Sequence, residues 1–376
     1  MRSTLILAFL TSSVCSVVAG PVGDRVPLTK RAGPIKANSY IIKLKDGVSK
    51  SAHLTSLLSG SKVAYTYDRA FQGYSAQLDG KALEYVRQSK DVEYIVQDEI
   101  VKLQDISTSG AQVAARNTAY EDFSLVKRVN GTGVDVYQID TGIYTVHTQF
   151  GGRAKWGATF GGMEMDMAQV MILLIRTALA SVIVGSTFGV ATRANITAIK
   201  AFGDDGSANL SDIIQGINWV ITTAASTGRP SIISITVTIS GYQPFDNAVT
   251  NALNAGIHVV VAAGDQNVDA STISPARVTA AVTVGAVAAN GSKLSTSNFG
   301  SVVDVWGPGR NVPVAWISSP NAALTLVGTT ASAASNVAGI LAVAIDNHGN
   351  KSPAALQADL KSNAQTVNGF LIPKVW

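Results

Sequence analysis

Val134–Gly142 reads VDVYQIDTG, an apolar strand pattern that ends in Asp-Thr-Gly. Further apolar runs follow along the chain, and helical patterns such as SDIIQGINWVITTAAS and NAVTNALNAG separate some of them. Strands that are apolar on both faces and alternate with helices predict a parallel sheet that is covered on both sides. We therefore expect a doubly wound α/β domain over residues 117–376. The other runs are Asn195–Phe202, Ser231–Ile239, Ile257–Gly264, Ala280–Val287 and Val302–Gly307.

A smaller unit precedes this domain and begins near Ser39. Its strand patterns are SYIIKLK, YTYDRAFQGYSAQL and VEYIVQDEIVKL, and its helical patterns are HLTSLLSG and KALEYVRQ. Period-2 segments mixed with helical ones predict a small α+β unit, which we assign to residues 20–105. The stretch Gln104–Arg116 is polar and lacks periodicity. It indicates a linker, which we place at residues 106–116.

The N-terminus reads as a secretory signal peptide over residues 1–19. Arg2 gives a positive start, Leu5–Leu10 is apolar, and Val17-Val18-Ala19 is a small-residue cleavage site. A signal anchor is the alternative, but the apolar part is too short to span a bilayer. The only cysteine, Cys15, lies in this segment. We therefore expect a secreted, extracellular protein without disulfides, thiol chemistry or cysteine-ligated metals.

The composition narrows the classes of function. Charged residues make up 14% of the 376 residues, compared with about 25% in typical soluble proteins. The net charge is +4, and the basic residues are scattered rather than clustered. This distribution excludes a nucleic-acid-binding surface. Five triplets match the N-glycosylation pattern of secreted chains, at Asn130, Asn195, Asn209, Asn290 and Asn350.

Several ordered motifs together carry a family resemblance. IDTGIYTVHTQFGGRA, AAGDQNVDAS, TVGAVAANGSKLSTSNFGSVVDVWGPG and GTTASAASNVAGILA follow one another along the chain. Their order and spacing resemble the subtilisin-like serine proteases, and most of all the secreted, proteinase K-like fungal group. In the first unit, FQGYSAQL and VEYIVQDEIV resemble the inhibitory propeptide of that family. The resemblance implies a ferredoxin-like propeptide, a subtilisin-like peptidase domain and a zymogen.

The resemblance also implies a mechanism for hydrolysing peptide bonds. A Ser attacks the carbonyl, a His moves the proton, a buried Asp orients the His, and an Asn stabilises the oxyanion. Asp140 lies in the unchanged Asp motif. The family places its His in Gly-x-Gly-His-Gly-Thr-His, but residues 161–186 read GGMEMDMAQVMILLIRTALASVIVGS. The four histidines, which we expect to be structural or solvated, are His53, His147, His258 and His348.

The nucleophile segment also departs from the family pattern. Residues 328–339 read GTTASAASNVAG where the family has Gly-Thr-Ser-Met-Ala-x-Pro-His-Val-Ala-Gly, one residue shorter. Alignment from the left puts Thr330 at the nucleophile position, and alignment from the right puts Ala331 there. Ser332 is the nearest serine, and we take it as the candidate nucleophile. Helix capping is the alternative use of these hydroxyls.

Two further positions affect the predicted cleft. Asp265 replaces the oxyanion Asn, and a carboxylate there repels the developing negative charge; loss of the amide donor alone costs about 100- to 1000-fold in rate. Thr236–Gly241 reads TVTISG where the family has Ser-Leu-Gly-Gly, so β-branched side chains replace glycines that admit the substrate backbone. Ala288 stands where proteinase K-like members carry a calcium-associated Asp. A structural calcium ion stays an open expectation, and we expect no other cofactor or metal.

The segment 163–182 has two alternative explanations. MEMDMA contains three single-codon methionines, and reading one base earlier gives x-Gly-(Asp/Asn)-Gly-(His/Tyr)-Gly, the missing motif. A frame error or a misplaced splice boundary would produce this. The other explanation is a transmembrane helix over residues 167–184, but Arg176 lies in its middle and costs about 2.5–3.5 kcal/mol on insertion scales.

The sequence therefore predicts a secreted subtilisin-like serine endopeptidase by family, whose printed chain is inactive or impaired. The alternatives are a non-catalytic pseudoprotease that binds polypeptide or its own propeptide, and the product of a frameshifted gene. We expect a monomer whose partners are a polypeptide substrate or the propeptide, with no nucleic acid and no membrane. An inactive chain should retain its propeptide unless another protease cuts at Lys30-Arg31 or Lys127-Arg128.

Overall fold

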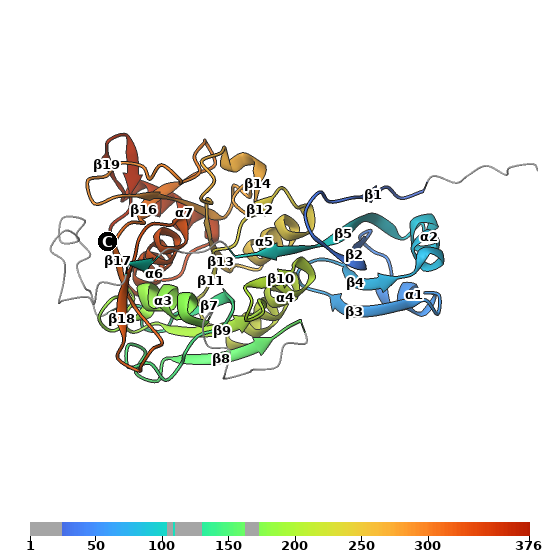
Figure 1. Cartoon of the computed structure of the whole chain (residues 1–376), viewed down its shortest axis with the longest axis horizontal. Helices are drawn as coiled ribbons and strands as arrows, with labels where there is room; N and C mark the ends of the chain where they lie inside the picture. The colour runs from blue at the N-terminus through green and yellow to red at the C-terminus, as the bar shows by residue number, and fades with distance from the viewer. Residues whose placement is uncertain (1–24, 104–107, 110–129, 162–172) are drawn as a thin grey trace, which may run out of the picture.

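The computed structural model describes residues 25–103, 108–109, 130–161 and 173–376 (Figure 1). The predicted signal peptide with Cys15, most of the predicted linker, Lys127-Arg128 and residues 162–172 lie outside these ranges. Figure 1 shows a large α/β domain on the left and a smaller N-terminal unit on the right. This arrangement agrees with the two-part organisation expected from the sequence.

Seven strands form the central sheet of the α/β domain, in the order β16-β15-β13-β11-β7-β9-β8. All neighbouring strands are parallel. The chain builds the sheet outward from β7 in both directions, so the predicted doubly wound α/β fold is confirmed. The strands are β7 (Asp135–Asp140), β8 (Ala154–Thr159), β9 (Asn195–Lys200), β11 (Ser231–Ile235), β13 (His258–Ala262), β15 (Val282–Val287) and β16 (Val305–Pro308).

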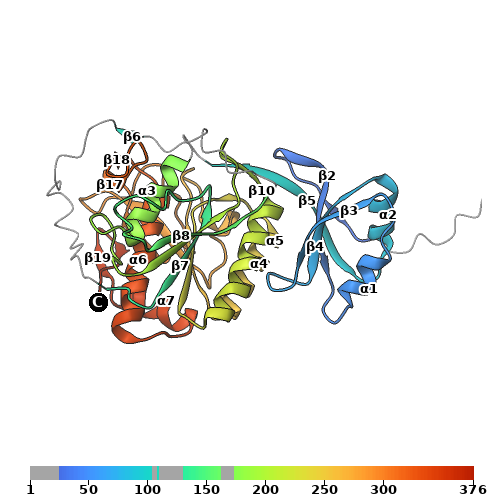
Figure 2. The same ribbon diagram turned by 90° about the horizontal axis from the view of Figure 1, so that it is seen from below.

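Helices cover both faces of this sheet, as Figure 2 shows. The side chains of β7 alternate between the two layers, because successive residues of a strand point to opposite faces. Val136 joins the apolar cluster formed with α3 (Leu173–Val184) and α6 (Thr330–His348). Ile139 joins the cluster formed with α4 (Leu210–Thr227) and α5 (Gln243–Asn254). A further helix, α7 (Pro353–Ser362), packs Leu356 and Leu360 onto the first cluster.

The N-terminal unit is a sheet with two helices on one face. Its main strands have the order β1-β5-β2-β4-β3, and only β1 and β5 are parallel. Apolar side chains such as Ile42 and Val86 form a core between the sheet and its helices. The elements are β1 (Leu28–Thr29), β2 (Ile35–Leu44), β3 (Ser61–Tyr67), β4 (Gly73–Leu78), β5 (Val92–Lys102), α1 (Lys50–Thr55) and α2 (Gly80–Gln88).

The opposite face of this sheet packs on α4 and α5 of the α/β domain. Ile41, Tyr67 and Val96 belong to the same buried cluster as Ile214 of α4 and Val249 of α5. The strand β10 (Ser207–Asn209) also pairs antiparallel with the end of β5. The two units therefore share one apolar core and one short hydrogen-bonded ladder.

Asp98 of β5 caps the N-terminus of α4. Its carboxylate is fully buried and accepts hydrogen bonds from the Ser211 backbone N–H (3.0 Å), the Ser211 hydroxyl (2.7 Å) and the Ser39 hydroxyl (3.0 Å). Burial raises the pKa of Asp98, while these hydrogen bonds act in the opposite direction. A carboxylate at this position satisfies an amide that the helix itself leaves unpaired. The N-terminal unit thus completes a helix of its neighbour.

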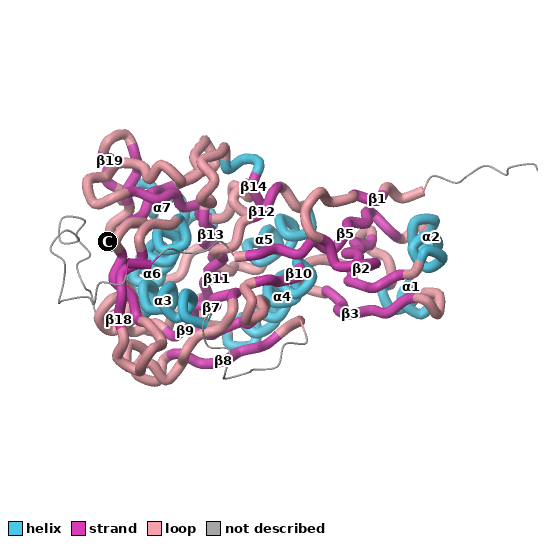
Figure 3. Tube along the Cα trace, in the orientation of Figure 1, coloured by secondary structure: helices cyan, strands magenta, loops and turns pink. Residues whose placement is uncertain are grey.

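The shorter elements lie around the sheet, and Figure 3 shows how much of the chain between them is loop. One expectation is corrected here: the run Ser231–Ile239 is not one strand, because β11 ends at Ile235 and Ile239–Ser240 pairs separately with β14. Within the described residues, no helix is long and apolar enough to cross a membrane. These elements are β6 (Thr108–Ser109), β12 (Ile239–Ser240), η2 (Ala270–Thr272), β14 (Ile273–Ser274), β17 (Val312–Ala315), β18 (Ala323–Leu326), β19 (Gln365–Val367) and β20 (Phe370–Ile372).

Replacing Asp98 should destabilise the chain. Asp98→Ala leaves the amide and hydroxyl of Ser211 and the hydroxyl of Ser39 without their buried acceptor, and we expect a loss of about 1–3 kcal/mol in the free energy of unfolding. Urea unfolding followed by circular dichroism measures this loss. Asp46→Ala is the matched control, since the Asp46 side chain is 96% exposed. Equal midpoints for the two variants would contradict the capping role of Asp98.

Candidate active site

The candidate site lies at the carboxyl edge of the parallel sheet. Asp140 is the last residue of β7, Thr236 follows β11, and Asp265 lies shortly after β13. Thr330 is the first residue of α6, whose N-terminus faces the same edge. Because the carboxyl ends of parallel strands meet at one edge, the fold brings these side chains together.

Asp140 is a buried carboxylate held by its neighbours. It is 1% exposed, and it accepts hydrogen bonds from the Thr141 backbone N–H (2.8 Å) and the Thr236 hydroxyl (3.2 Å). The buried ammonium of Lys200 donates to the carbonyl of the next residue, Thr141 (3.1 Å). A buried Asp fixed in this way can orient a base. The segment that would carry that base, residues 162–172, lies outside the described residues.

Asp265 caps α6 from the position where an oxyanion donor is expected. Its carboxylate accepts hydrogen bonds from the Thr330 backbone N–H (2.9 Å), the Thr330 hydroxyl (3.0 Å) and the Thr329 hydroxyl (3.0 Å). Burial raises the pKa of Asp265, and the three hydrogen bonds oppose this shift. An ionised carboxylate only accepts hydrogen bonds. In this arrangement both oxygens of Asp265 bind the start of α6, and the side chain presents no amide donor at this position.

Ser332, the candidate nucleophile, points into the protein interior. It is fully buried within α6, and its hydroxyl donates to the carbonyls of Thr329 (2.9 Å) and Gly309 (3.3 Å). The hydroxyl that lies at the site is that of Thr330, the residue given by alignment from the left. It also accepts a hydrogen bond from the Gly264 backbone N–H (3.2 Å). Thr330 and Ser332 are both buried, at 1% and 0% exposed, and their hydroxyls have different partners.

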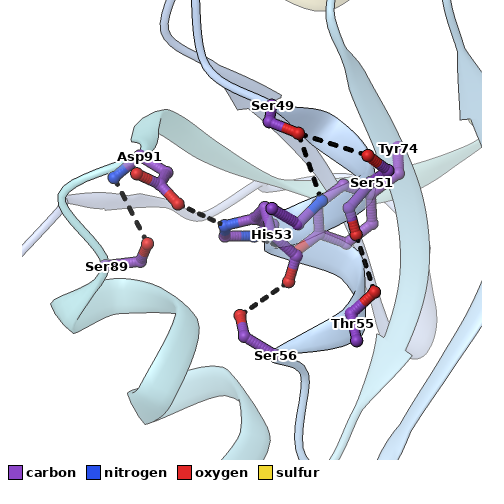
Figure 4. Close-up of polar contacts among 9 residues, drawn as sticks. Ser49, Ser51, His53, Thr55, Ser56, Tyr74, Ser89 and Asp91 are labelled. Atoms are coloured by element: carbon purple, nitrogen blue, oxygen red, sulfur yellow. Dashed lines mark hydrogen bonds and ion pairs between the residues drawn. The ribbon is translucent and has the colours of Figure 1, made fainter.

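The four histidines have partners elsewhere in the described structure. His147 bonds to the carbonyl of Ala322 (3.0 Å), and His258 bonds to the side chain of Asn350 (2.9 Å). Figure 4 shows His53 of the N-terminal unit between Asp91 and Tyr74, at 3.1 Å from each. His348 stacks on Trp376. No hydrogen bond or ion pair among the described residues joins a histidine to Asp140.

The segment Thr236–Gly241 contacts the N-terminal unit at Arg31. Its end forms β12, which pairs with β14, and the carbonyls of Ser240 and Gly241 accept hydrogen bonds from Arg31. Of the four β-branched residues predicted to narrow this segment, Val237 is buried and Thr236, Thr238 and Ile239 are partly buried.

The glycosylation candidates differ in their exposure. Asn290 and Asn350 are exposed, whereas the side chains of Asn130, Asn195 and Asn209 are partly buried and donate to Asn347, Asp135 and Asp212. For calcium, the described residues contain no group of three or more acidic, histidine or cysteine side chains placed to hold an ion. Ala288, at the calcium-associated position, is partly buried against the core.

Two roles were not identified from the sequence. Thr236 donates to Asp140, and this pairing depends on where β11 ends. Asn218 of α4 binds three backbone amides of the N-terminal unit, as described below. Its signal in the sequence is weak: an amide side chain between the apolar residues Ile217 and Trp219.

Comparison with known proteins places this geometry in context. The model of the subtilase family matches residues 177–373, and the model of the peptidase inhibitor I9 family matches residues 39–104. The subtilase match begins just after the described chain resumes at residue 173, and it does not include Asp140. The inhibitor match covers the N-terminal unit from β2 to β5.

Individual relatives cover more of the chain. This chain is 35% identical over 349 residues to subtilisin-like protease 2 of Pseudogymnoascus destructans, and the match covers 88% of this chain and 86% of that protein. It is 34% identical over 338 residues to subtilisin-like protease 4 of Arthroderma gypseum, covering 83% and 82%. The structure is similar to a cold-adapted subtilisin-like serine proteinase, with a TM-score of 0.59 and 32% identity over 66% of this chain and 90% of that one.

The buried histidines should make stability fall in acid. Burial lowers the pKa of His258 and His147, so the unfolded chain binds protons more readily than the folded one as the pH falls through about 6.5. We expect the unfolding midpoint to drop between pH 7.5 and pH 5.5, and to drop less in His258→Gln. Thermal unfolding at the two pH values measures this, with exposed His348→Gln as control. The same drop in all three proteins would refute the role of His258.

Proposed function

Because the chain belongs to the subtilase family, we propose that it is a secreted subtilase that keeps the fold and the propeptide but has little or no peptidase activity. Secretion rests on the predicted signal peptide over residues 1–19, and the exposed Asn290 and Asn350 are its best-placed glycosylation sites. We also propose that it acts as a monomer.

The observation that carries this proposal is the set of contacts made by Asp265. Peptide hydrolysis by this family needs a proton acceptor beside the nucleophile and a donor facing the oxyanion. Here the hydroxyl of Thr330 donates to Asp265, and both carboxylate oxygens bind the start of α6 where the family has an amide donor. The four histidines have other partners. Without a triad base, only about 10³- to 10⁴-fold catalysis over water remains, and it comes from binding and the oxyanion hole.

A second candidate function is retention of a polypeptide, which the propeptide contacts favour. The side-chain oxygen of Asn218 accepts hydrogen bonds from the backbone amides of Asp68 (3.1 Å), Arg69 (2.8 Å) and Ala70 (3.0 Å). Asn251 of α5 donates to the carbonyl of Ala70 (2.7 Å). These bonds recognise backbone rather than side chains. They support a pseudoprotease that holds its own propeptide.

A frameshifted gene remains the third alternative, and the transcript decides it. Sequencing across codons 155–190 and 325–340 should give the printed residues if the inactive subtilase is genuine. Reads that encode a Gly-His-Gly motif and a Gly-Thr-Ser turn would instead identify an ordinary endopeptidase. If only the histidine segment changes, Thr330 and Asp265 still predict weak activity.

The direct test measures processing and covalent labelling of the full chain. After secretion from a eukaryotic host, we expect an intact mass that includes the propeptide and no labelling by a fluorophosphonate probe. We also expect no hydrolysis of casein above that of Asp140→Ala. An active subtilase assayed in parallel controls for the probe and the substrate. A new N-terminus within residues 106–116 that is lost in Asp140→Ala would overturn the proposal.

Asn218 should govern how firmly the propeptide is held. Asn218→Ala removes one acceptor shared by three amides, and we expect faster proteolytic cleavage near residues 68–71, by about tenfold, because protection depends on the docked state. Limited proteolysis with mass spectrometry measures the rate. Asn254→Ala changes an exposed asparagine of α5 and is the matched control. Unchanged cleavage in Asn218→Ala would show that the three hydrogen bonds do not hold the turn.

A further inference from the structure

The residues before the inhibitor domain form a strap that reaches the peptidase domain. We define the strap as residues 25–34. Leu28–Thr29 of the strap forms β1, which pairs with β5, and Arg31 follows two residues later. The backbone N–H of Arg31 donates to the side chain of Gln97 (2.8 Å). The strap is therefore anchored to β5 on both sides of Lys30, which is exposed.

The guanidinium of Arg31 is bound on three sides. It donates to the carbonyls of Gly241 (3.0 Å) and Ser240 (2.9 Å), and its Nε pairs with Glu99. The central carbon of the guanidinium, Cζ, lies 4.9 Å from the centre of the Tyr242 ring. The side chains of Arg31 and Glu99 are 15% and 9% exposed. All three nitrogens of one planar group thus have a partner, and only the bond to Ser240 is exposed.

This geometry selects a guanidinium over an ammonium. A guanidinium presents its donors in a fixed fork and stacks on aromatic rings, whereas a lysine ammonium is a compact, strongly hydrated charge. Two carbonyls and one carboxylate around one plane match the fork. A lysine side chain could reach one or two of these oxygens.

The local charges are balanced. A second guanidinium, that of Arg277, lies against Gly241, where a Cβ atom would come within 2.2 Å of it. Arg277 pairs with Asp246 (2.5 Å), and Arg31 pairs with Glu99. Each cation therefore has its own acid, and removal of Arg31 would leave Glu99 buried without its partner. A buried charge that has lost its partner destabilises the folded chain.

We propose that Ser240–Tyr242, together with Glu99, form a binding site for an arginine side chain of a polypeptide, and that Arg31 of the strap is its occupant. The bound Arg31 holds the strap against the end of the Thr236–Gly241 segment, and we call this contact the latch. It also holds the Arg31 side chain away from proteases that recognise Lys30-Arg31. The latch is independent of whether the peptidase is active, so it does not stand or fall with the proposed function.

The first test empties the site in the full chain. In Arg31→Ala, hydrogen–deuterium exchange in peptides covering residues 94–103 and 239–242 should rise by about tenfold. Low millimolar ethylguanidinium should restore protection, whereas ethylammonium and the variant Arg31→Lys should not. Lys30→Ala is the matched control and should exchange like the parent chain. Equal protection in Arg31→Ala and the parent, or equal rescue by both cations, would overturn the proposal.

The second test starts from the unaltered chain. An arginine-specific endoprotease added to the unaltered chain should cut after the exposed Arg193 about tenfold faster than after Arg31, because cleavage there requires the latch to open. In Glu99→Gln the rate at Arg31 should rise while the rate at Arg193 stays the same. Cleavage after Arg31 as fast as after Arg193 in the parent chain would contradict a closed latch.

Discussion

A parallel sheet must be covered on both faces, and the rest of this structure depends on that requirement. One face is covered by α3 and α6, and the other by α4 and α5. The segment that departs most from the family's histidine motif still supplies α3, whose Ala180 and Ile183 are buried in the core. The sheet is covered even where the sequence departs from the family's histidine motif.

The same sheet gathers polar ends at its carboxyl edge, and their pairing explains the character of the site. In a working subtilase this edge holds a donor for the oxyanion and a hydroxyl next to a base. In this chain the carboxylate of Asp265 binds the hydroxyls of Thr329 and Thr330 and the first amide of α6. Three donors that could face a substrate face one acceptor of the protein. The edge has the contacts of a helix cap.

The sequence predicted the elements whose signal is local. The apolar runs of β7, β13 and β15 and the periodic helices α4 and α5 lie where they were expected, because burial on both faces leaves little choice of residue. The end of β11 at Ile235 could not be read locally, because Thr236 turns to Asp140 and Ile239 pairs with a distant strand. The choice between Thr330 and Ser332 depends on the helical phase of α6, which places the two hydroxyls in different surroundings. The latch of Arg31 joins residues more than 200 positions apart and has no local signal.

The pairing of β5 with β10 has a consequence for the life of the protein in solution. The backbone groups of Ser207–Asn209 form a sheet edge, and the N-terminal unit covers it. An uncovered edge can pair with the edge of another molecule. A protease that sheds its propeptide must tolerate that exposure after maturation. As long as the N-terminal unit stays docked, β5 occupies this edge and leaves no room there for a strand of a second molecule.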